Sequence, residues 1–593
     1  MQLRQQAGLD SPQHPQVSDQ SSTLSLAGPA PEHQNYHEGT HEPAYLAGDR
    51  QGETGHFTVD GERGSHFLGA TAAAHLLPAD DEDCHLVQPA SPWHGDPSHE
   101  RTSFVTFPFH SRLDSWSILE AGSKLPEPTR LRRLIDVYFA ETPWRFAPVS
   151  RNYFDGVLDL VTSGNSNSSL IQQAAQLAMI FGLISVGCLF DASVPSHSDE
   201  AKSYSMLSLH CLGIANFLTH TSTACLVSLH LYCCFLINED RPRVDEIFAI
   251  VGLALRLATI AGFHKDGSRW GLPGAEVDAR RRIWWEILTL ERINANRFGL
   301  SPFIQADVFD ASTPADESTD GFLAWRWEWD NILHQLIKVI QEPSSDPSSV
   351  QQRDGIVRSY WSRLPNHLKY RQVRDGGRTE SLQQIRLALH FNTGLLQCHR
   401  SSFQLALRTH SREPMESERA YSVESVIDEA CPAIIALVDA LYGDYGLIFT
   451  RHIVAALDLF SAIVPLAALV MRSPRSTKSV SAHNLLLRGL ALLEQAADAT
   501  PCLWYAVLLT RGKRMAARAT SRLASRWTTE SRHSSPPVMP QGSEVGVMTY
   551  EYSDGGRDDF DFDQWLESIW EPLSTPDQES MFAIFGDTRG QGV

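Results

Sequence analysis

The sequence has few cysteines for its length. Nine cysteines are spread over 593 residues, and only Cys84 precedes Cys188. A binuclear zinc cluster needs six closely spaced thiolates, because each metal ion takes four ligands and two thiolates are shared. The paired cysteines and histidines of a zinc finger are also missing. These 593 residues therefore hold no cysteine-based zinc module. Most of the cysteines lie within apolar helical patterns, which favours a reducing compartment.

Long hydrophobic runs are also missing. The longest apolar run extends from Leu177 to Phe190, which is shorter than the ~20 residues that a bilayer-spanning helix needs. The first residues, Met-Gln-Leu-Arg-Gln-Gln, lack the apolar centre of a signal peptide. We therefore expect an intracellular protein that does not cross a membrane.

Positive charge is in the minority. The chain has 50 basic and 70 acidic residues, so its formal net charge is −20. Nucleic acid attracts proteins through basic surfaces, so this balance argues against broad binding of the whole chain to DNA. Hydrophobic residues make up 42% of the sequence, which is enough for a large core. We expect one large domain between two polar arms.

Motifs of enzyme chemistry are absent from the sequence. It has no nucleophile elbow, phosphate-binding loop, dinucleotide fingerprint or His-Glu-x-x-His helix. His264 and Asp266 could form an acid–base pair, but no nucleophile lies near them in the sequence. The acidic run 80–83 is similar to one magnesium motif of helical terpene cyclases, yet no second motif accompanies it. We therefore predict no catalytic residue, cofactor or metal site, with a terpene-cyclase-like enzyme as a distant alternative.

The most informative stretch covers residues 247–310. It begins with residues that are apolar on every face except at Arg256, and Gly262 follows them. This pattern predicts a buried helix that ends in a left-handed turn. A lone guanidinium in a buried helix needs a carboxylate partner. We therefore expect Arg256 to be buried and paired with Glu291 or Asp310.

A second helix is predicted downstream of Pro273. It has Glu276 four residues before Arg280 and Asp278 four residues before Arg282. An acidic residue four positions ahead of a basic one is the favourable order for an ion pair along a helix. We therefore expect both pairs to form.

Six short motifs follow one another in this stretch: Gly-Leu-Ala-x-Arg-x-Ala, a His-basic-Asp loop, Arg-Arg-Arg-x-Trp-Trp, an acidic–Arg pair, a Gly-Leu-x-Pro turn and a final Asp-Val. In this order they resemble the fungal-specific transcription factor domain, the regulatory middle homology region usually found downstream of a six-cysteine zinc cluster. Two departures from the family pattern are Glu291, where Asp is more frequent, and Leu300, where Arg is more frequent. The residues that we expect to form its structural signature are Arg256, His264, Asp266, Arg280, Arg281, Arg282, Trp284, Trp285, Glu291 and Arg292.

The resemblance covers roughly residues 130–525 and implies an all-α fold. We expect an irregular multi-helix bundle over residues 130–527, flanked by a disordered arm over 1–115 that is rich in His, Gln, Ser and Pro and by a disordered tail over 528–593. The resemblance further implies a nuclear transcription regulator that controls a metabolic or biosynthetic gene cluster, with the helical domain serving dimerisation, repression or effector sensing.

The missing zinc cluster leaves three interpretations open. The gene prediction is truncated, or the protein has lost its DNA-binding module, or it is a co-regulator that acts by pairing with a DNA-binding relative. Under each interpretation, contact with DNA needs a partner or a missing N-terminal module. Homodimers and heterodimers both remain open.

The tail combines acidic residues with aromatic ones. Between Glu551 and Glu571 it holds eight acidic residues and one arginine. This composition is typical of activation segments, and a groove on a coactivator could fold such a segment into an amphipathic helix. The alternative is a helix that docks on the protein's own core. The residues that we expect to contact the transcription machinery are Phe560, Phe562, Trp565, Leu566, Ile569 and Trp570.

Four arginines are spaced four residues apart near the end of the expected domain: Arg514, Arg518, Arg522 and Arg526. A basic stripe of this kind would favour nuclear import. The alternative is a solvated helix face, whose cations suit the carboxyl end of the helix.

Overall fold

The computed structural model describes most of the chain between residues 115 and 530 and one short segment before it. The described ranges are 55–60, 64–69, 115–163, 168–195, 197–239, 243–298, 300–314, 321–341, 347–371, 377–500 and 502–530. The predicted all-α fold is confirmed for the body of the protein. Two short strands, β1 (Gly55–Asp60) and β2 (Gly64–Gly69), pair with each other within the arm that we expected to be disordered. Nothing in the sequence predicted them.

The first helices of the body pack around α4 (Leu170–Phe190). Side chains of α4 are buried without interruption from Ala174 to Phe190, because its sequence is apolar on every face. Ser169 begins the helix by accepting a hydrogen bond from the backbone N–H of Gln172. Among the early helices, those that contact α4 are α1 (Ser115–Ser123), α2 (Pro128–Glu141), α3 (Arg151–Thr162), α5 (Asp199–Ile214) and α6 (Thr223–Asn238). Of these, α1 precedes the expected start of the domain.

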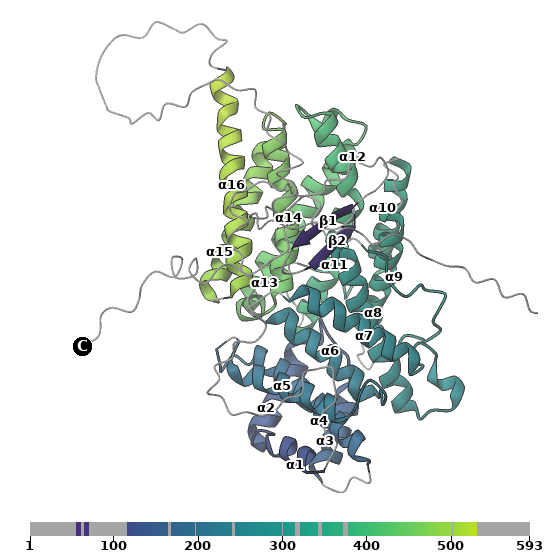
Figure 1. Cartoon of the computed structure of the whole chain (residues 1–593). Helices are drawn as coiled ribbons and strands as arrows, with labels where there is room; N and C mark the ends of the chain where they lie inside the picture. The colour runs from purple at the N-terminus through teal and green to yellow at the C-terminus, as the bar shows by residue number, and fades with distance from the viewer. Residues whose placement is uncertain are drawn as a thin grey trace, which may run out of the picture. The chain divides into compact units, whose positions relative to one another are not determined.

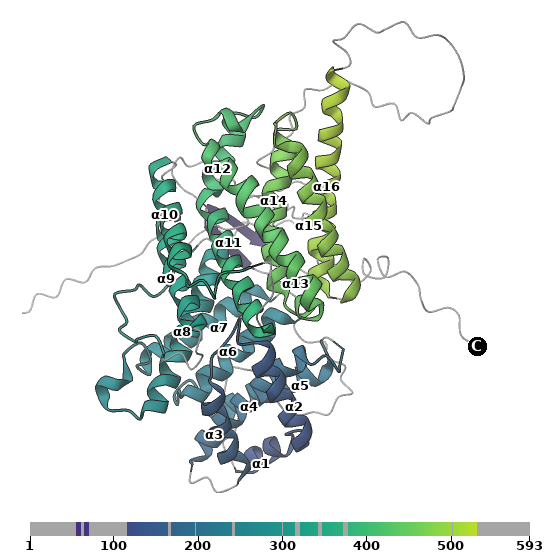
Figure 2. The same ribbon diagram turned by 180° about the vertical axis from the view of Figure 1, so that it is seen from behind.

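The later helices are organised by α11 (Arg378–Thr409) and α14 (Ile453–Arg472). The first of these, 32 residues long, contacts α14 and four further helices; these are α9 (Phe322–Gln341), α10 (Pro347–Arg363), α12 (Ala420–Glu424) and α13 (Cys431–Arg451). A π-helical turn, Ser425–Ala430, joins α12 to α13. Figures 1 and 2 show α13, α14, α15 (Ser479–Ala499) and α16 (Leu503–Glu530) side by side in green to yellow.

Two of these core helices are long enough to cross a bilayer. α4 has 21 residues and α14 has 20, and both are sufficiently apolar. The expectation that no segment reaches this length is therefore wrong. However, 94% of the most apolar window of α4 and 78% of that of α14 is buried inside the fold. Packing against neighbouring helices accounts for their composition.

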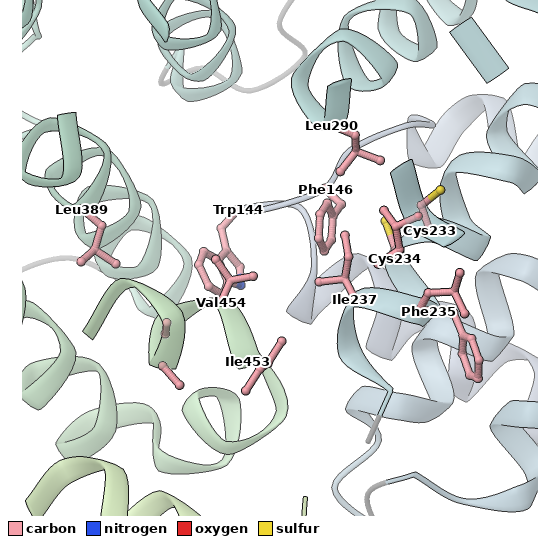
Figure 3. Close-up of a cluster of buried hydrophobic side chains, with 14 of the residues drawn as sticks. Trp144, Phe146, Cys233, Cys234, Phe235, Ile237, Leu290, Leu389, Ile453 and Val454 are labelled. Atoms are coloured by element: carbon pink, nitrogen blue, oxygen red, sulfur yellow. The ribbon is translucent and has the colours of Figure 1, made fainter. Parts of the chain in front are cut away.

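The two groups of helices share one hydrophobic core. The loop after α2 supplies Trp144 and Phe146, which are each 4% exposed. Figure 3 shows Trp144 toward Val454 of α14 and Phe146 toward Ile237 of α6. Within this body, α7 (Val244–Ile260) and α8 (Gly274–Phe298) pack on α6 and on each other, and α8 also contacts α9. This central position of α7 and α8 is where the predicted signature lies.

Candidate functional site

Asp266 organises the loop between α7 and α8. Its buried carboxylate accepts hydrogen bonds from the guanidinium of Arg281 at 2.7, 2.8 and 3.0 Å. It also accepts from the backbone N–H and hydroxyl of Ser268 at 3.1 and 2.7 Å, and from the backbone N–H of Ser312 at 3.1 Å. The hydrogen bonds from Arg281 and the other donors hold the pKa of Asp266 far below its usual range. Asp266 therefore fixes the loop, α8 and the segment after α8 in one arrangement.

Asp310 completes the same arrangement from segment 300–314. Its carboxylate accepts a hydrogen bond from the backbone N–H of Asp266 at 2.9 Å and another from Arg269 at 2.7 Å. The backbone N–H groups of Asp310 and Ala311 both donate to the carbonyl of His264, at 3.1 and 3.3 Å. Burial lowers the pKa of the His264 ring. His264 and Asp266 could have formed an acid–base pair, but Asp266 is engaged by other donors. Both side chains therefore serve packing and loop geometry.

Arg280 ties α8 to the carboxyl end of α7. Its Nη2 donates to the carbonyl of Ala261 at 2.8 Å. Its guanidinium lies 3.7 Å from the centroid of the Phe263 ring, which is within the range of a cation–π interaction. Between these two residues Gly262 has a φ of 74°, the left-handed turn that its position after the apolar helix predicted.

Both predicted ion pairs along α8 form. Arg280 lies 4.0 Å from Glu276, and Arg282 lies 3.8 Å from Asp278. Both separations are long for an ion pair, so neither pair makes a close contact between its charged groups. Their value is in confirming the predicted register of the helix.

The two tryptophans of the signature bury its aromatic side. Trp284 is 0% exposed and Trp285 is 4% exposed. Both rings pack edge-to-face on Phe309, each with a centroid separation of 5.7 Å. The indole nitrogen of Trp285 also donates to the carbonyl of Ser312 at 3.1 Å. The loop after α7, the start of α8 and segment 300–314 thus form one packed unit, which we call the α7–α8 node.

Glu291 and Arg292 continue the node toward α9. One carboxylate oxygen of Glu291 accepts from the backbone N–H of Phe303 at 2.7 Å, and the other has no hydrogen-bond partner within the described part of the chain. Burial raises the pKa of Glu291 to about 7. Arg292 is 0% exposed, and its guanidinium donates to the side chain of Asn331 at 3.2 Å. Glu291 therefore holds the loop that carries Phe303.

Arg256 does not belong to the node, and the expectation that it is buried against Glu291 or Asp310 is wrong. Its side chain is exposed, and no ion pair involves it among the described residues. Its guanidinium lies 5.8 Å from the centroid of the Phe303 ring. Ile260, one turn further along α7, is 86% exposed. One face of α7 is therefore uncovered, although its sequence is apolar on nearly every face.

A buried ionic cluster lies beside the node and was not predicted. Arg326 of α9 and Glu286 of α8 form an ion pair, and both side chains are 1% exposed. Glu286 also accepts hydrogen bonds from the indole of Trp327 at 3.2 Å and from the backbone N–H of Ala147 at 3.1 Å. His230 of α6 lies 3.7 Å from the same carboxylate, and burial lowers its pKa to about 3. The cluster therefore joins α6, α8, α9 and the loop after α2.

Asp330 extends the ionic cluster by one helical turn. It is buried, it accepts a hydrogen bond from the hydroxyl of Thr289, and burial raises its pKa to about 6. The sequence signal was the pattern Trp-Arg-Trp-Glu-Trp-Asp at 325–330, in which Arg326 and Asp330 lie four residues apart on the same side as buried aromatic residues.

A serine–histidine–aspartate arrangement links α10, α11 and α12. The two ring nitrogens of His399 lie 3.0 Å from Asp354 and 3.1 Å from the hydroxyl of Ser422, and Tyr421 donates to the same aspartate at 2.8 Å. A nucleophilic serine must be reached by its substrate. Ser422 is 3% exposed and His399 is 0% exposed. The arrangement therefore braces the helices beside the π-helical turn.

The remaining predicted features are placed as follows. The eight cysteines within the described ranges are all buried and free, and those ranges contain no group of three side chains suited to a metal ion. Of the arginine stripe on α16, Arg514 is exposed while Arg518 and Arg522 are half-buried. The side chain of Arg526 lies outside the described residues, as do the tail residues Phe560, Phe562, Trp565, Leu566, Ile569 and Trp570.

Residues 135–359, from within α2 to within α10, match the family described as "Fungal specific transcription factor domain". The matched segment contains the whole α7–α8 node and the buried ionic cluster. It also contains every residue of the predicted signature. The resemblance that the six motifs indicated is thereby confirmed.

Three curated relatives match parts of the chain that are shorter than this segment. Activator of stress genes 1 of Saccharomyces cerevisiae is 25% identical over 202 residues, which are 32% of this chain and 20% of that protein. The ABC-transporter-regulating transcription factor of Aspergillus fumigatus is 30% identical over 127 residues, 21% of this chain and 14% of that protein. The Pyriculol/pyriculariol biosynthesis cluster transcription factor 1 of Pyricularia oryzae is 32% identical over 97 residues, which are 16% of this chain and 12% of that protein. The matches thus span less than a quarter of each of these relatives.

Proposed function

We propose that this chain, whose residues 135–359 match the fungal specific transcription factor domain, regulates the transcription of a metabolic or biosynthetic gene cluster in a fungal nucleus. The relatives described above are transcription regulators by name, and one of them serves a biosynthesis cluster. The observation that carries the proposal is the α7–α8 node, because the motifs shared with the family form one interlocked unit at the centre of the matched segment.

The helical body is the regulatory part in this proposal. Its described residues supply buried packing and ion pairs, with the one serine–histidine–aspartate arrangement closed to substrate. Repression, dimerisation and effector response are the tasks that such a body can perform, since each needs only a surface or a change in helix packing. The node couples the loop after α7 to the loop around Phe303, so a change at one loop is transmitted to the other.

The tail is the activating part in this proposal. Eight acidic residues between Glu551 and Glu571 accompany Phe560, Phe562, Trp565 and Trp570. Acidic residues keep such aromatic side chains in water until a partner with an apolar groove and a basic rim binds them. We therefore assign recruitment of a coactivator or of the transcription machinery to this segment.

DNA is reached either through a DNA-binding partner or through a module outside this sequence. The cysteines within the described ranges are buried, and burial raises the pKa of the Cys211 thiol to about 12 and that of Cys398 to about 12, so these thiols do not serve as zinc ligands. The observation agrees with both routes, and the first of them defines a second candidate function, a co-regulator that pairs with a DNA-binding relative.

Two measurements test the proposal. Deleting the gene in its fungus should change the transcripts of a set of neighbouring biosynthetic or transport genes at least several-fold, and the intact gene should restore them. Scattered changes with no co-regulated gene set would contradict a role as a cluster regulator.

The second measurement isolates the tail. Residues 551–585 fused to an unrelated DNA-binding module should activate a reporter. Trp565→Ala with Trp570→Ala should abolish the activation, whereas removal of a single acidic residue should only weaken it. An inactive fusion, or full activity of the double variant, would reduce the tail to a docking helix.

A further inference from the structure

The uncovered side of α7 presents large apolar side chains to solvent. Ile260 is 86% exposed, Phe303 is 58% exposed and Val308 is 44% exposed. Arg256 connects the first two, since it lies one turn before Ile260 and its guanidinium is 5.8 Å from the centroid of the Phe303 ring. Grouped exposed apolar side chains mark interaction surfaces. We call Arg256, Ile260, Lys265, Phe303 and Val308 the α7 face.

The α7 face is held in a fixed shape by the node. The backbone N–H of Phe303 donates to Glu291 at 2.7 Å. The ammonium group of Lys265 donates to the carbonyl of Val308 at 3.0 Å. A surface whose loops are already ordered loses little conformational entropy when a partner binds, which strengthens binding.

Positive charge accompanies this apolar surface. Arg256 is exposed and Lys265 is half-buried, and the nearby Arg269 is 65% exposed where it pairs with Asp310. The one unpaired acidic side chain of the adjoining loop within the described residues is the exposed Asp307. In a protein of net charge −20, this combination favours a ligand that is both acidic and apolar.

The geometry points to one occupant, and we propose that the α7 face docks residues 558–571 of the same chain. This segment carries six acidic residues and no basic one. If the segment is helical, Phe562, Trp565 and Ile569 fall on one side of it, which is the pattern of a helix that lies on an apolar surface. Acidic side chains on its flanks would meet Arg256 and Lys265.

The connection between the body and the segment is long enough for this contact. About 30 residues separate the end of α16 at Glu530 from Phe560, and a chain of ~30 residues can span up to ~100 Å. A folded unit of ~400 residues has a radius of gyration of only ~21 Å. Tethering also places the segment at an effective concentration of ~1 mM. A weak contact is therefore sufficient for docking.

Docking would hide the apolar side of the segment from a coactivator. Release of the tail from the α7 face would then be a step in activation. This consequence rests on the proposed function of the tail, whereas the docking itself does not, and the two are tested separately.

The test uses the full-length chain with a photo-reactive phenylalanine analogue in place of Trp565. After illumination, we expect cross-links within residues 256–265 or 300–310. An isotope-labelled chain without the analogue is mixed in, so that a cross-link to the labelled chain identifies a second copy. Cross-links elsewhere, cross-links only between copies, or no cross-link would each overturn the proposal.

A matched pair of variants gives the specificity. Arg256→Glu with Ile260→Glu should lower the yield of the cross-link roughly tenfold, because two exposed contacts are replaced by repulsion. Leu119→Glu in α1, where the leucine is 67% exposed, should leave the yield unchanged. Equal yields in both variants would overturn the proposal. Since these side chains are exposed, both variants should keep the wild-type melting temperature.

The reporter assay separates this proposal from the proposed function. A cross-link to the α7 face together with an inactive tail fusion would refute activation by the tail and leave docking established. An active tail fusion without the cross-link would refute docking alone. With both present, Arg256→Glu with Ile260→Glu should raise activation by the full-length regulator.

Discussion

The α7–α8 node and the buried ionic cluster use the same kinds of side chain in opposite ways. In the node, Asp266 is held by Arg281 and by further donors, so its ionised form is stabilised and its pKa is lowered. In the cluster, Asp330 is buried. The cost of burying its ionised form exceeds what its hydrogen bond and the nearby arginines return, so its pKa is raised to about 6. The difference shows that hydrogen bonds made directly to the carboxylate, above all from a guanidinium, can outweigh the cost of burial, whereas cations that lie nearby without such bonds do not.

The largest effect is expected at Arg326, because its removal leaves the buried Glu286 without its cation. Arg326→Ala should lower the free energy of unfolding by roughly 3–5 kcal/mol. Arg326→Met with Glu286→Gln should recover part of this loss, since both charges are then removed. Denaturant titration of the three proteins measures the effect, and a double variant less stable than Arg326→Ala would contradict it.

Asp266 should show a smaller effect with a clear dependence on pH. Its pKa in the folded protein is lowered, so its contribution to stability is present above the ordinary pKa of an aspartate and is lost as the pH falls below it. Asp266→Asn should therefore cost about 2 kcal/mol at pH 7 and much less at low pH. Melting temperatures measured across the acidic range test this, and a constant difference between variant and wild type would refute it.

Glu291 should show the opposite dependence on pH. Its pKa is raised to about 7 in the folded protein, so its contribution to stability is greatest at acidic pH and declines as the pH rises through 7. Glu291→Gln keeps an acceptor for the backbone of Phe303 and removes the ionisation. The variant should gain ~1 kcal/mol over wild type at pH 8 and little at pH 5. An equal gain at both pH values would show that Glu291 does not titrate in this range.

The smallest effect on stability is expected at Arg256. Because its side chain is exposed and its one described contact is with the ring of Phe303, Arg256→Ala should change the free energy of unfolding by less than about 0.5 kcal/mol. Thermal unfolding of the variant beside Arg326→Ala provides a direct contrast between an exposed and a buried arginine. A melting temperature of Arg256→Ala several degrees below that of wild type would instead indicate a buried Arg256, as the sequence first suggested.

The features that depend on neighbours in the sequence were predicted well. The all-α fold, the left-handed turn at Gly262 and the pairs of Glu276 with Arg280 and Asp278 with Arg282 all follow from local patterns. The family resemblance rested on the same kind of local pattern and is confirmed.

The features that depend on distant packing were missed. The exposure of Arg256 is one example, because a helix that is apolar on every face does not reveal which face has no neighbour. The pair of Glu286 with Arg326 is another, since these residues are brought together by the crossing of α8 and α9. Nothing in either segment alone specifies the partner.

The spacing of the contacts in the chain also has a kinetic consequence. The contacts of Asp266 with Arg281 and Ser312 close loops of 15 and 46 residues, whereas Ala147 bonds to Glu286 across 139 residues and Arg326 to Arg145 across 181. Short loops lose less entropy on closure and can form earlier in folding. We expect Asp266→Asn to slow refolding and Arg326→Ala mainly to accelerate unfolding. On this basis we expect the segment most characteristic of the family to be the one around which the rest of the domain assembles.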